Sequence, residues 1–231
     1  MNTRVTRVLR ILKLTILYLF IYSIVIVILF RFIPPPVTPL MLIRVGEQIF
    51  SGQNVRMKKD WESLDNISRF MPKAVIASED QLFMKHNGFD IKSIKKAMQN
   101  NNKKGHKKVK GASTISQQVA KNVFLWPGRS WLRKGLEAYF TVLIELFWSK
   151  KRIIEVYVNV AEMGNGIYGA EAAALHYFNK PAQNLSQSQC AALAAILPNP
   201  RKWSPVNSTN YINRRKSWIR RNMARLPNPT F

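Results

Sequence analysis

The chain has 231 residues, of which 47% are hydrophobic, and it carries 36 lysines and arginines against 12 acidic residues, for a formal net charge of +24. The apolar share excludes a disordered basic tail, and the length allows one sizeable domain with a small appendage. The charge indicates a polyanionic partner, such as nucleic acid, anionic lipid or a phosphorylated substrate. The single cysteine, Cys190, excludes an internal disulfide framework, and histidines without ligand spacing predict no structural metal site.

An apolar stretch near the amino terminus predicts a transmembrane helix at residues 11–33. Residues 14–30 carry no charge, and the flanking Lys13 and Arg31 can reach the two interfaces of a bilayer core of about 30 Å. A cleavable signal peptide is the competing interpretation, but the prolines that follow suit a helix stop better than a cleavage site. The basic residues 1–10 predict a cytoplasmic tail. The rest of the chain would then lie outside the cytoplasm, so we expect no nucleic-acid partner.

Helical patterns dominate the remaining sequence. Residues 34–71, which begin with a stiff proline-rich connector, are predicted to be a linker and lead-in to one domain at 72–231. Capping and stop signals flank helix-periodic segments at 72–80, 112–125, 131–148, 150–163 and 169–178, and a capping box at 186–189 precedes a further helix. Because no series of alternating strands occurs, the fold class is predicted to be mainly α.

Two segments are strongly basic. Residues 92–110 are most simply a mobile, solvated segment. Residues 213–226 carry basic side chains among a few apolar anchors. They can form a patch for anionic headgroups, where each basic residue contributes about 1 kcal/mol, or a solvated helix face.

Two of the few acidic residues, Glu79 and Asp80, stand side by side where the helix at 72–80 is expected to end, with His86 and Asp90 close behind. Carboxylates at that end face the negative pole of the helix dipole, which disfavours their charged form. A local rule broken in this way is typical of a working site, although a solvated helix end is the alternative.

The helix expected at 112–125 carries a polar stripe. Helical spacing places Thr114, Gln118 and Lys121 on one face and apolar residues on the opposite face. A hydroxyl, an amide and an ammonium in line can bind phosphate or sugar oxygens. An ordinary amphipathic helix with a solvated face is the alternative.

The next helix, expected at 131–148, is apolar on nearly every side and is therefore predicted to be buried. A buried Glu137 needs a cationic partner, and Arg133 and Lys134 lie one turn away. Glu137 is then either half of a structural ion pair or a second site carboxylate opposite Glu79.

Five segments follow, in order, the motifs of the biosynthetic peptidoglycan glycosyltransferases, the lysozyme-like glycosyltransferase family 51. The resemblance runs from about residue 73 to 205, and the expected membrane anchor and the chain length resemble the monofunctional form of the family. The segments are EDQLFMKHNGFD, GASTISQQVAKN, RKGLEAYFTVLIE, KKRIIEVYVNVAEMG and GAEAAALHYFNKPAQNLSQSQCAALAAILPNP.

The resemblance implies a reaction and catalytic roles. Such enzymes polymerise lipid II into glycan strands, with inversion at the N-acetylmuramic acid carbon. Glu79 would be the general base, and Glu137 a second catalytic glutamate that orients basic residues or a divalent ion. Lys121, Arg129 and Arg133 would bind the leaving pyrophosphate.

The remaining substrate-binding residues are also implied by the resemblance. Three would shape the acceptor side, and five would contact sugar and phosphate. They are, respectively, Asp80, Phe83 and His86, and Ser113, Thr114, Gln117, Gln118 and Asn122.

The resemblance further implies a lysozyme-like helical fold with a small membrane-facing subdomain that contains residues 92–110. No cofactor would be required, with Mg or Mn at the pyrophosphate as a further candidate. The expected partners are lipid II, the growing strand and the anionic surface of a bacterial inner membrane, with other cell-wall synthesis or division proteins as candidates.

Two alternatives stand beside this function. A lysozyme-like enzyme that cleaves glycans could use Glu79 as an acid, but it would need neither a pyrophosphate site nor an anchor. A non-catalytic basic membrane scaffold would tolerate replacement of Glu79.

Overall fold

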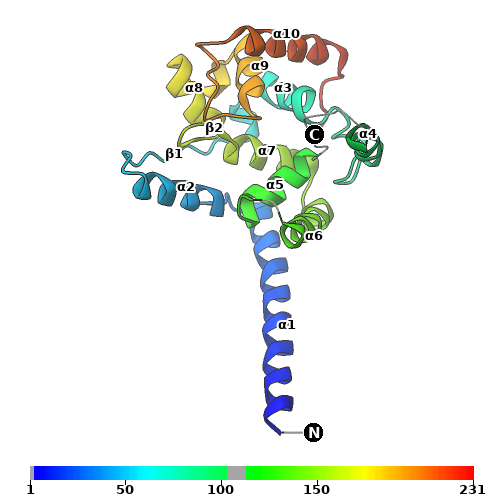
Figure 1. Ribbon diagram of the computed structural model, residues 1–231. Helices are drawn as coiled ribbons and strands as arrows, with labels where there is room; N and C mark the ends of the chain where they lie inside the picture. The colour runs from blue at the N-terminus through cyan, green and yellow to red at the C-terminus, as the bar shows by residue number, and fades with distance from the viewer. Residues whose placement is uncertain (1–2, 103–112, 129) are drawn as a thin grey trace.

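The computed structural model describes residues 3–102, 113–128 and 130–231 (Figure 1). Part of the predicted mobile segment, 103–110, and the predicted pyrophosphate ligand Arg129 lie outside the described residues. The described chain is mainly helical, as predicted, with a helical domain placed at one end of a long amino-terminal helix.

The amino-terminal helix, α1 (Thr3–Phe32), is long and apolar enough to cross a membrane. It is exposed along most of its length and projects away from the domain (Figure 1). Its last turns are tied to the domain, because the Trp148 indole donates to the Val27 carbonyl at 2.8 Å and the Arg152 guanidinium donates to the Phe30 carbonyl at 2.8 Å. The helix thus anchors the domain through fixed contacts as well as through the chain itself.

Residues 34–71, predicted as a linker and lead-in, contain regular structure that packs on the domain. Helix α2 (Pro39–Phe50) is capped by the Thr38 side chain and lies against α5. The 3-10 turn η1 (Leu64–Asn66) follows strand β1 (Lys58–Lys59). The Gln48 amide accepts from the Arg56 N–H at 2.6 Å and donates to its carbonyl at 3.2 Å, which holds the strand beside the helix.

A small sheet, in the order β1-β3-β2 among the described residues, closes one side of the domain. Strand β3 (Ile167–Tyr168) pairs in parallel with β1 and antiparallel with β2 (Glu162–Gly164). Between β2 and β3, Gly166 has φ +69°, a conformation that favours glycine. Strands of two or three residues are too short to show alternation, so the sequence analysis missed them.

Helix α9 packs against α3 and α10, while α5 packs against α6 and α7, and α3 also contacts α7. The small residues of α9 allow α3 and α10 to approach closely, and nearly all of them are fully buried. The helices and turns are α3 (Phe70–Glu79), α4 (Ile91–Asn102), α5 (Ile115–Phe124), α6 (Trp131–Phe147), α7 (Lys150–Val160), α8 (Ala170–Phe178), η2 (Ala182–Asn184), α9 (Gln187–Ile196) and α10 (Asn210–Arg225).

The predicted helices all occur, with ends that differ by a few residues. The predicted helix at 112–125 begins only at Ile115, because Thr114 is its amino-terminal cap. The predicted helix at 150–163 ends at Val160, and the residues that follow form β2. The capping box of Ser186 and Gln189 is confirmed.

The basic helix α10 lies at the end of the domain remote from α1 (Figure 1). A basic patch on α10 would therefore lie on the side of the domain remote from the membrane that α1 would cross. The solvated helix face is therefore the better of the two interpretations of residues 213–226, although Arg215 turns inward, as described below.

Gly166, which is crowded by its neighbours, and Gly46, which has open space around it, give a matched test of stability. A Cβ on Gly166 would lie 2.1 Å from the Arg56 carbonyl oxygen, whereas a Cβ on Gly46, inside α2, would meet nothing within 4 Å. We expect Gly166→Ala to lower the free energy of unfolding by at least about 2 kcal/mol. Gly46→Ala should raise it by about 0.5–1 kcal/mol. Thermal unfolding of the two full-length variants in one detergent, followed by circular dichroism, measures both; equal unfolding temperatures would contradict the described turn.

Candidate functional site

Two adjoining clefts in the domain share Ser113 in their walls. The first cleft, about 660 Å³, is lined by Glu79, Asp80 and Arg215 together with residues of α4. The second cleft, about 990 Å³, is lined by residues of α5, α6 and α7 and by two residues of α2. The two clefts form one continuous candidate site whose middle is the carboxyl end of α3.

Glu79 lies between the clefts as the last residue of α3. Its Oε1 accepts from the Ser78 hydroxyl at 2.9 Å and from the Arg215 guanidinium at 3.3 Å. Its Oε2 accepts from the side-chain amide of Gln118, a residue that lines the second cleft, at 3.2 Å. The Tyr157 hydroxyl donates to the Gln118 carbonyl oxygen at 3.2 Å. Burial raises the pKa of Tyr157 well above its usual value, so it stays a neutral donor and directs the amide N–H toward Glu79.

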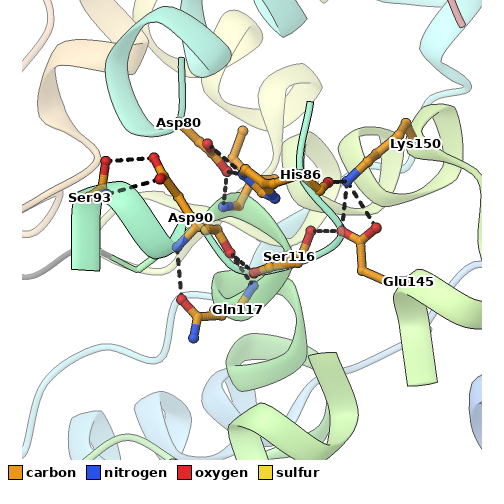
Figure 2. A network of polar contacts seen from close by, with 11 residues as sticks. Asp80, His86, Asp90, Ser93, Ser116, Gln117, Glu145 and Lys150 are labelled. Atoms are coloured by element: carbon orange, nitrogen blue, oxygen red, sulfur yellow. Dashed lines mark hydrogen bonds and ion pairs between the residues drawn. The ribbon is translucent and has the colours of Figure 1, made fainter. Parts of the chain in front are cut away.

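Asp80, the neighbour of Glu79, points into the protein. Its carboxylate contacts the His86 Nε2 at 2.9 Å and accepts from the backbone N–H of Ile115, the first residue of α5, at 3.0 Å (Figure 2). A buried helix start needs an acceptor for its free N–H groups, and a carboxylate there also complements the helix dipole. The predicted pair of acids therefore divides, with Glu79 at the clefts and Asp80 holding α5 against the end of α3.

Three residues predicted to contact substrate are engaged within the protein. Thr114 and Gln117 form the capping box of α5, and the Thr114 hydroxyl donates to the Gly88 carbonyl at 2.6 Å. Phe83 is 0% exposed, with the Lys150 ammonium 4.6 Å from its ring centroid. Of the three residues only Thr114 lines the first cleft, and these contacts leave little of the three side chains for a ligand.

The second cleft has a cationic wall. Arg133 donates to Glu137 Oε2 at 2.6 Å, and Lys134 contacts the other carboxylate oxygen, so the predicted cationic partner of Glu137 is confirmed twice. Lys121 and the neighbouring Asn122 line the same cleft. Lys121 makes no ion pair within the described chain. Burial lowers the pKa of Lys121 although Glu137 acts in the opposite direction. Three cations therefore face one carboxylate, an arrangement that binds a polyanion.

A second buried network fixes the helices that carry these groups (Figure 2). The Lys150 ammonium, at the start of α7, donates to Glu145 of α6 at 2.8 Å and to the His86 carbonyl at 2.7 Å. The Ser116 hydroxyl of α5 contacts the same Glu145. At the edge of the first cleft, the Asp90 carboxylate accepts from the Ser93 N–H at 2.9 Å at the start of α4. Hydrogen bonds to Ser93 lower the pKa of Asp90, although burial opposes them.

The described residues do not fit a cation held by the protein alone. No group of three histidine, cysteine or acidic side chains suited to a metal ion occurs in the parts that the structure describes. Both oxygens of Glu137, the predicted orienter of such an ion, are already paired with cationic side chains. The predicted Mg or Mn stays a prediction, and no step below depends on it.

The sequence analysis missed three residues that contact the site. Tyr157 sits inside a quoted motif, but nothing in the motif indicates that its hydroxyl would reach Gln118. Lys134 was named only as a partner of Glu137. Arg215 lies in the basic helix α10, outside the resembling segments, and its neighbours in sequence gave no signal that one arginine of the helix turns toward the cleft.

A helical domain on an apolar amino-terminal helix, with a carboxylate beside a cationic cleft, has the arrangement expected of a membrane-anchored enzyme for an anionic substrate. Residues 46–224 match the sequence model described as transglycosylase, and the chain belongs to this family. It is 52% identical over 209 residues to a biosynthetic peptidoglycan transglycosylase of Pseudomonas putida, covering 90% of this chain and 88% of the relative. It is also 52% identical over 223 residues to the protein of the same name from Bacteroides thetaiotaomicron, covering 96% and 89%.

Lys121 gives a prediction that separates stability from activity. Because its folded-state pKa is lowered, its charged form destabilises the fold at neutral pH, and the destabilisation is relieved as the pH rises through that pKa. We expect Lys121→Met to raise the free energy of unfolding by about 1 kcal/mol at neutral pH, less at alkaline pH, while activity falls at least about 100-fold. Unfolding curves at two pH values and a transglycosylase assay test this.

The matched control is Lys151→Gln, which removes an exposed ion pair with Asp65 outside the clefts. It should change neither stability nor activity measurably. A Lys121→Met protein that is less stable than the wild type at neutral pH would contradict the described burial.

Proposed function

We propose that the protein is a membrane-anchored peptidoglycan glycosyltransferase that polymerises lipid II into glycan strands and releases undecaprenyl pyrophosphate. The observation that carries the proposal is the place of Glu79, which is bonded to Gln118 where the two clefts meet, beside the cationic wall of the second cleft. Family membership and the relatives described above support the same reaction.

Glu79 acts as the general base. The incoming lipid II lies in the first cleft with the 4-hydroxyl of its N-acetylglucosamine at the Glu79 carboxylate, which takes the hydroxyl proton. That oxygen attacks C1 of the N-acetylmuramic acid on the strand in the second cleft. The bond from C1 to the lipid pyrophosphate breaks on the opposite face, so the α-linkage becomes β. Gln118 and Arg215 hold the carboxylate in position through their hydrogen bonds.

The cationic wall stabilises the leaving group. Negative charge develops on the pyrophosphate oxygen as the bond to C1 breaks, and fixed cations that need no rearrangement lower the barrier most. Lys121 has no ion pair with any residue that the structure describes, and Arg133 and Lys134 are oriented by Glu137. Glu137 therefore acts by positioning these side chains, and Arg129, whose placement is not described, is a further ligand by the family resemblance.

The remaining predicted residues divide by their contacts. Ser113 and Asn122 line the second cleft, and with no side-chain hydrogen bond to another described residue they can contact sugar or phosphate oxygens. Asp80, His86, Phe83, Thr114 and Gln117 act indirectly, because their side chains hold α3, α5 and the segment between them together.

The anchor places the clefts at a membrane surface. The Ser23 hydroxyl of α1 lies 2.7 Å from the Tyr139 hydroxyl of α6. Ser23 precedes Phe32, the last residue of α1, by nine residues, which corresponds to about 14 Å along α1. Helix α6 then reaches the depth of the interface, where its exposed Leu132 and Leu146 contact lipid. We infer an inner membrane with α1 starting in the cytoplasm, and anionic headgroups and other cell-wall proteins as partners.

The decisive variant is Glu79→Gln, which keeps the shape of the side chain and one acceptor oxygen but removes the base. We expect polymer formation from purified lipid II to fall at least about 1,000-fold. Gel separation of labelled strands in one detergent measures the change, with circular dichroism as the check on folding.

Asp65→Asn is the control, since Asp65 is exposed and its ion pair among the described residues is with Lys151, outside the clefts. It should polymerise like the wild type. A Glu79→Gln protein with near wild-type polymerisation would overturn the assigned base, and a wild type that binds lipid II without making polymer would favour the scaffold alternative.

A further inference from the structure

A second charge cluster borders the second cleft, and two of its residues, Arg44 of α2 and Glu162 of β2, line that cleft. Helix α5 packs against α2 on one side and α6 on the other, so the cluster and the cationic wall of α6 flank the same helix (Figure 1). The cluster consists of Arg44 with Glu47, and Glu162 with Arg201 nearby. Burial raises the pKa of Glu162, and the charges of Arg44, Arg201 and Glu47 also act on it.

Polar atoms in this cluster lack partners. Arg44 Nε and Glu162 Oε1 are buried without a hydrogen bond in the described chain, and so is the Tyr168 hydroxyl of the neighbouring strand β3, which does not line the cleft. Arg44 Nε lies 3.6 Å from Glu162 Oε2, too far for a good hydrogen bond. Glu162 is 9% exposed and Tyr168 is 0% exposed. Buried donors and acceptors are normally satisfied, so such a group in a cleft wall indicates a ligand that supplies the missing partners.

The charge balance of the cluster selects an uncharged ligand. Arg44 pairs with Glu47 at 2.7 Å and Arg201 pairs with the same carboxylate at 3.3 Å, so two arginines face two glutamates. A phosphate here would meet Glu162, whereas a hydroxyl or an acetamide can donate to the carboxylate and accept from the guanidinium. Apolar residues complete the wall and suit the C–H face of a sugar ring: Leu40, Leu197, Pro198 and Pro200.

We propose that the Arg44–Glu162 pair is a subsite for an uncharged 2-acetamido sugar of the growing strand, beyond the sugar that carries the pyrophosphate. The inference rests on the proposed function and adds α2 to the substrate-binding wall. Leu40 and Arg44 precede residue 46, where the family match begins, so this part of the wall belongs to the segment that joins the anchor to the domain. The subsite holds the strand by neutral contacts while the cationic wall holds its pyrophosphate.

Two probes separate the subsite from the cationic wall. Binding of a β-1,4-linked N-acetylglucosamine tetrasaccharide and of inorganic pyrophosphate is measured by calorimetry on the full chain in detergent. Arg44→Gln and Glu162→Gln should each weaken tetrasaccharide binding about tenfold and leave pyrophosphate binding unchanged. Lys121→Gln should have the opposite pattern. Arg201→Gln is the matched control, because it removes the other ion pair of Glu47 without lining the cleft, and it should change neither.

Arg44→Lys covers the case in which a neutral variant fails to fold, because it keeps the charge and loses the Nε donor; it should bind the tetrasaccharide several-fold more weakly. Unchanged tetrasaccharide binding in Arg44→Gln or Arg44→Lys, or no tetrasaccharide binding by the wild type, would overturn the subsite. A loss of pyrophosphate binding in Arg44→Gln would also overturn it and assign an anion site instead. Polymer formation by the wild type, measured in parallel, shows separately whether the proposed function holds.

Discussion

The Asp80 carboxylate connects the two helices that carry the site. It accepts the first N–H of α5 and contacts His86, while the residue before it in sequence, Glu79, is the last of α3. The orientation of α5 sets where Gln118 and Lys121 lie relative to Glu79. A buried helix start without an acceptor is costly, so this single contact both stabilises the fold and fixes the distance between the base and the cationic cleft.

The site keeps polar atoms that a purely stable protein would satisfy or remove. Lys121 stays buried without an ion pair within the described chain, and Arg133 and Arg215 each keep a buried Nε with no hydrogen bond. These groups destabilise the fold, and the extended hydrophobic core of the domain offsets them. A ligand with phosphate oxygens supplies the missing acceptors, so substrate binding and folding stability are linked.

Local patterns predicted the parts of the structure that local forces determine. The common face of Gln118 and Lys121 on α5 and the ion pair of Glu137 follow from helical spacing alone, whereas Thr114, predicted on the same stripe, caps the helix instead. The helices occur where capping and periodicity place them. Contacts between segments that are distant in the sequence could not be predicted from local patterns. Arg215 meets Glu79 from a helix far along the chain, and Asp80 looked like part of a catalytic pair because its acceptor role depends on where α5 begins in space. The segment 34–71 read as a connector because its short elements gain stability only from packing on the domain.

The central claim is that the strand's pyrophosphate lies in the second cleft while the acceptor hydroxyl meets Glu79 from the first. The most direct measurement is the structure of the full-length Glu79→Gln protein bound to a lipid-linked tetrasaccharide, the product of a single coupling. The account predicts the pyrophosphate within hydrogen-bond distance of Lys121 and Arg133, with C1 of the adjoining sugar facing residue 79. Pyrophosphate beside Arg215 in the first cleft, with the second cleft empty, would contradict the account.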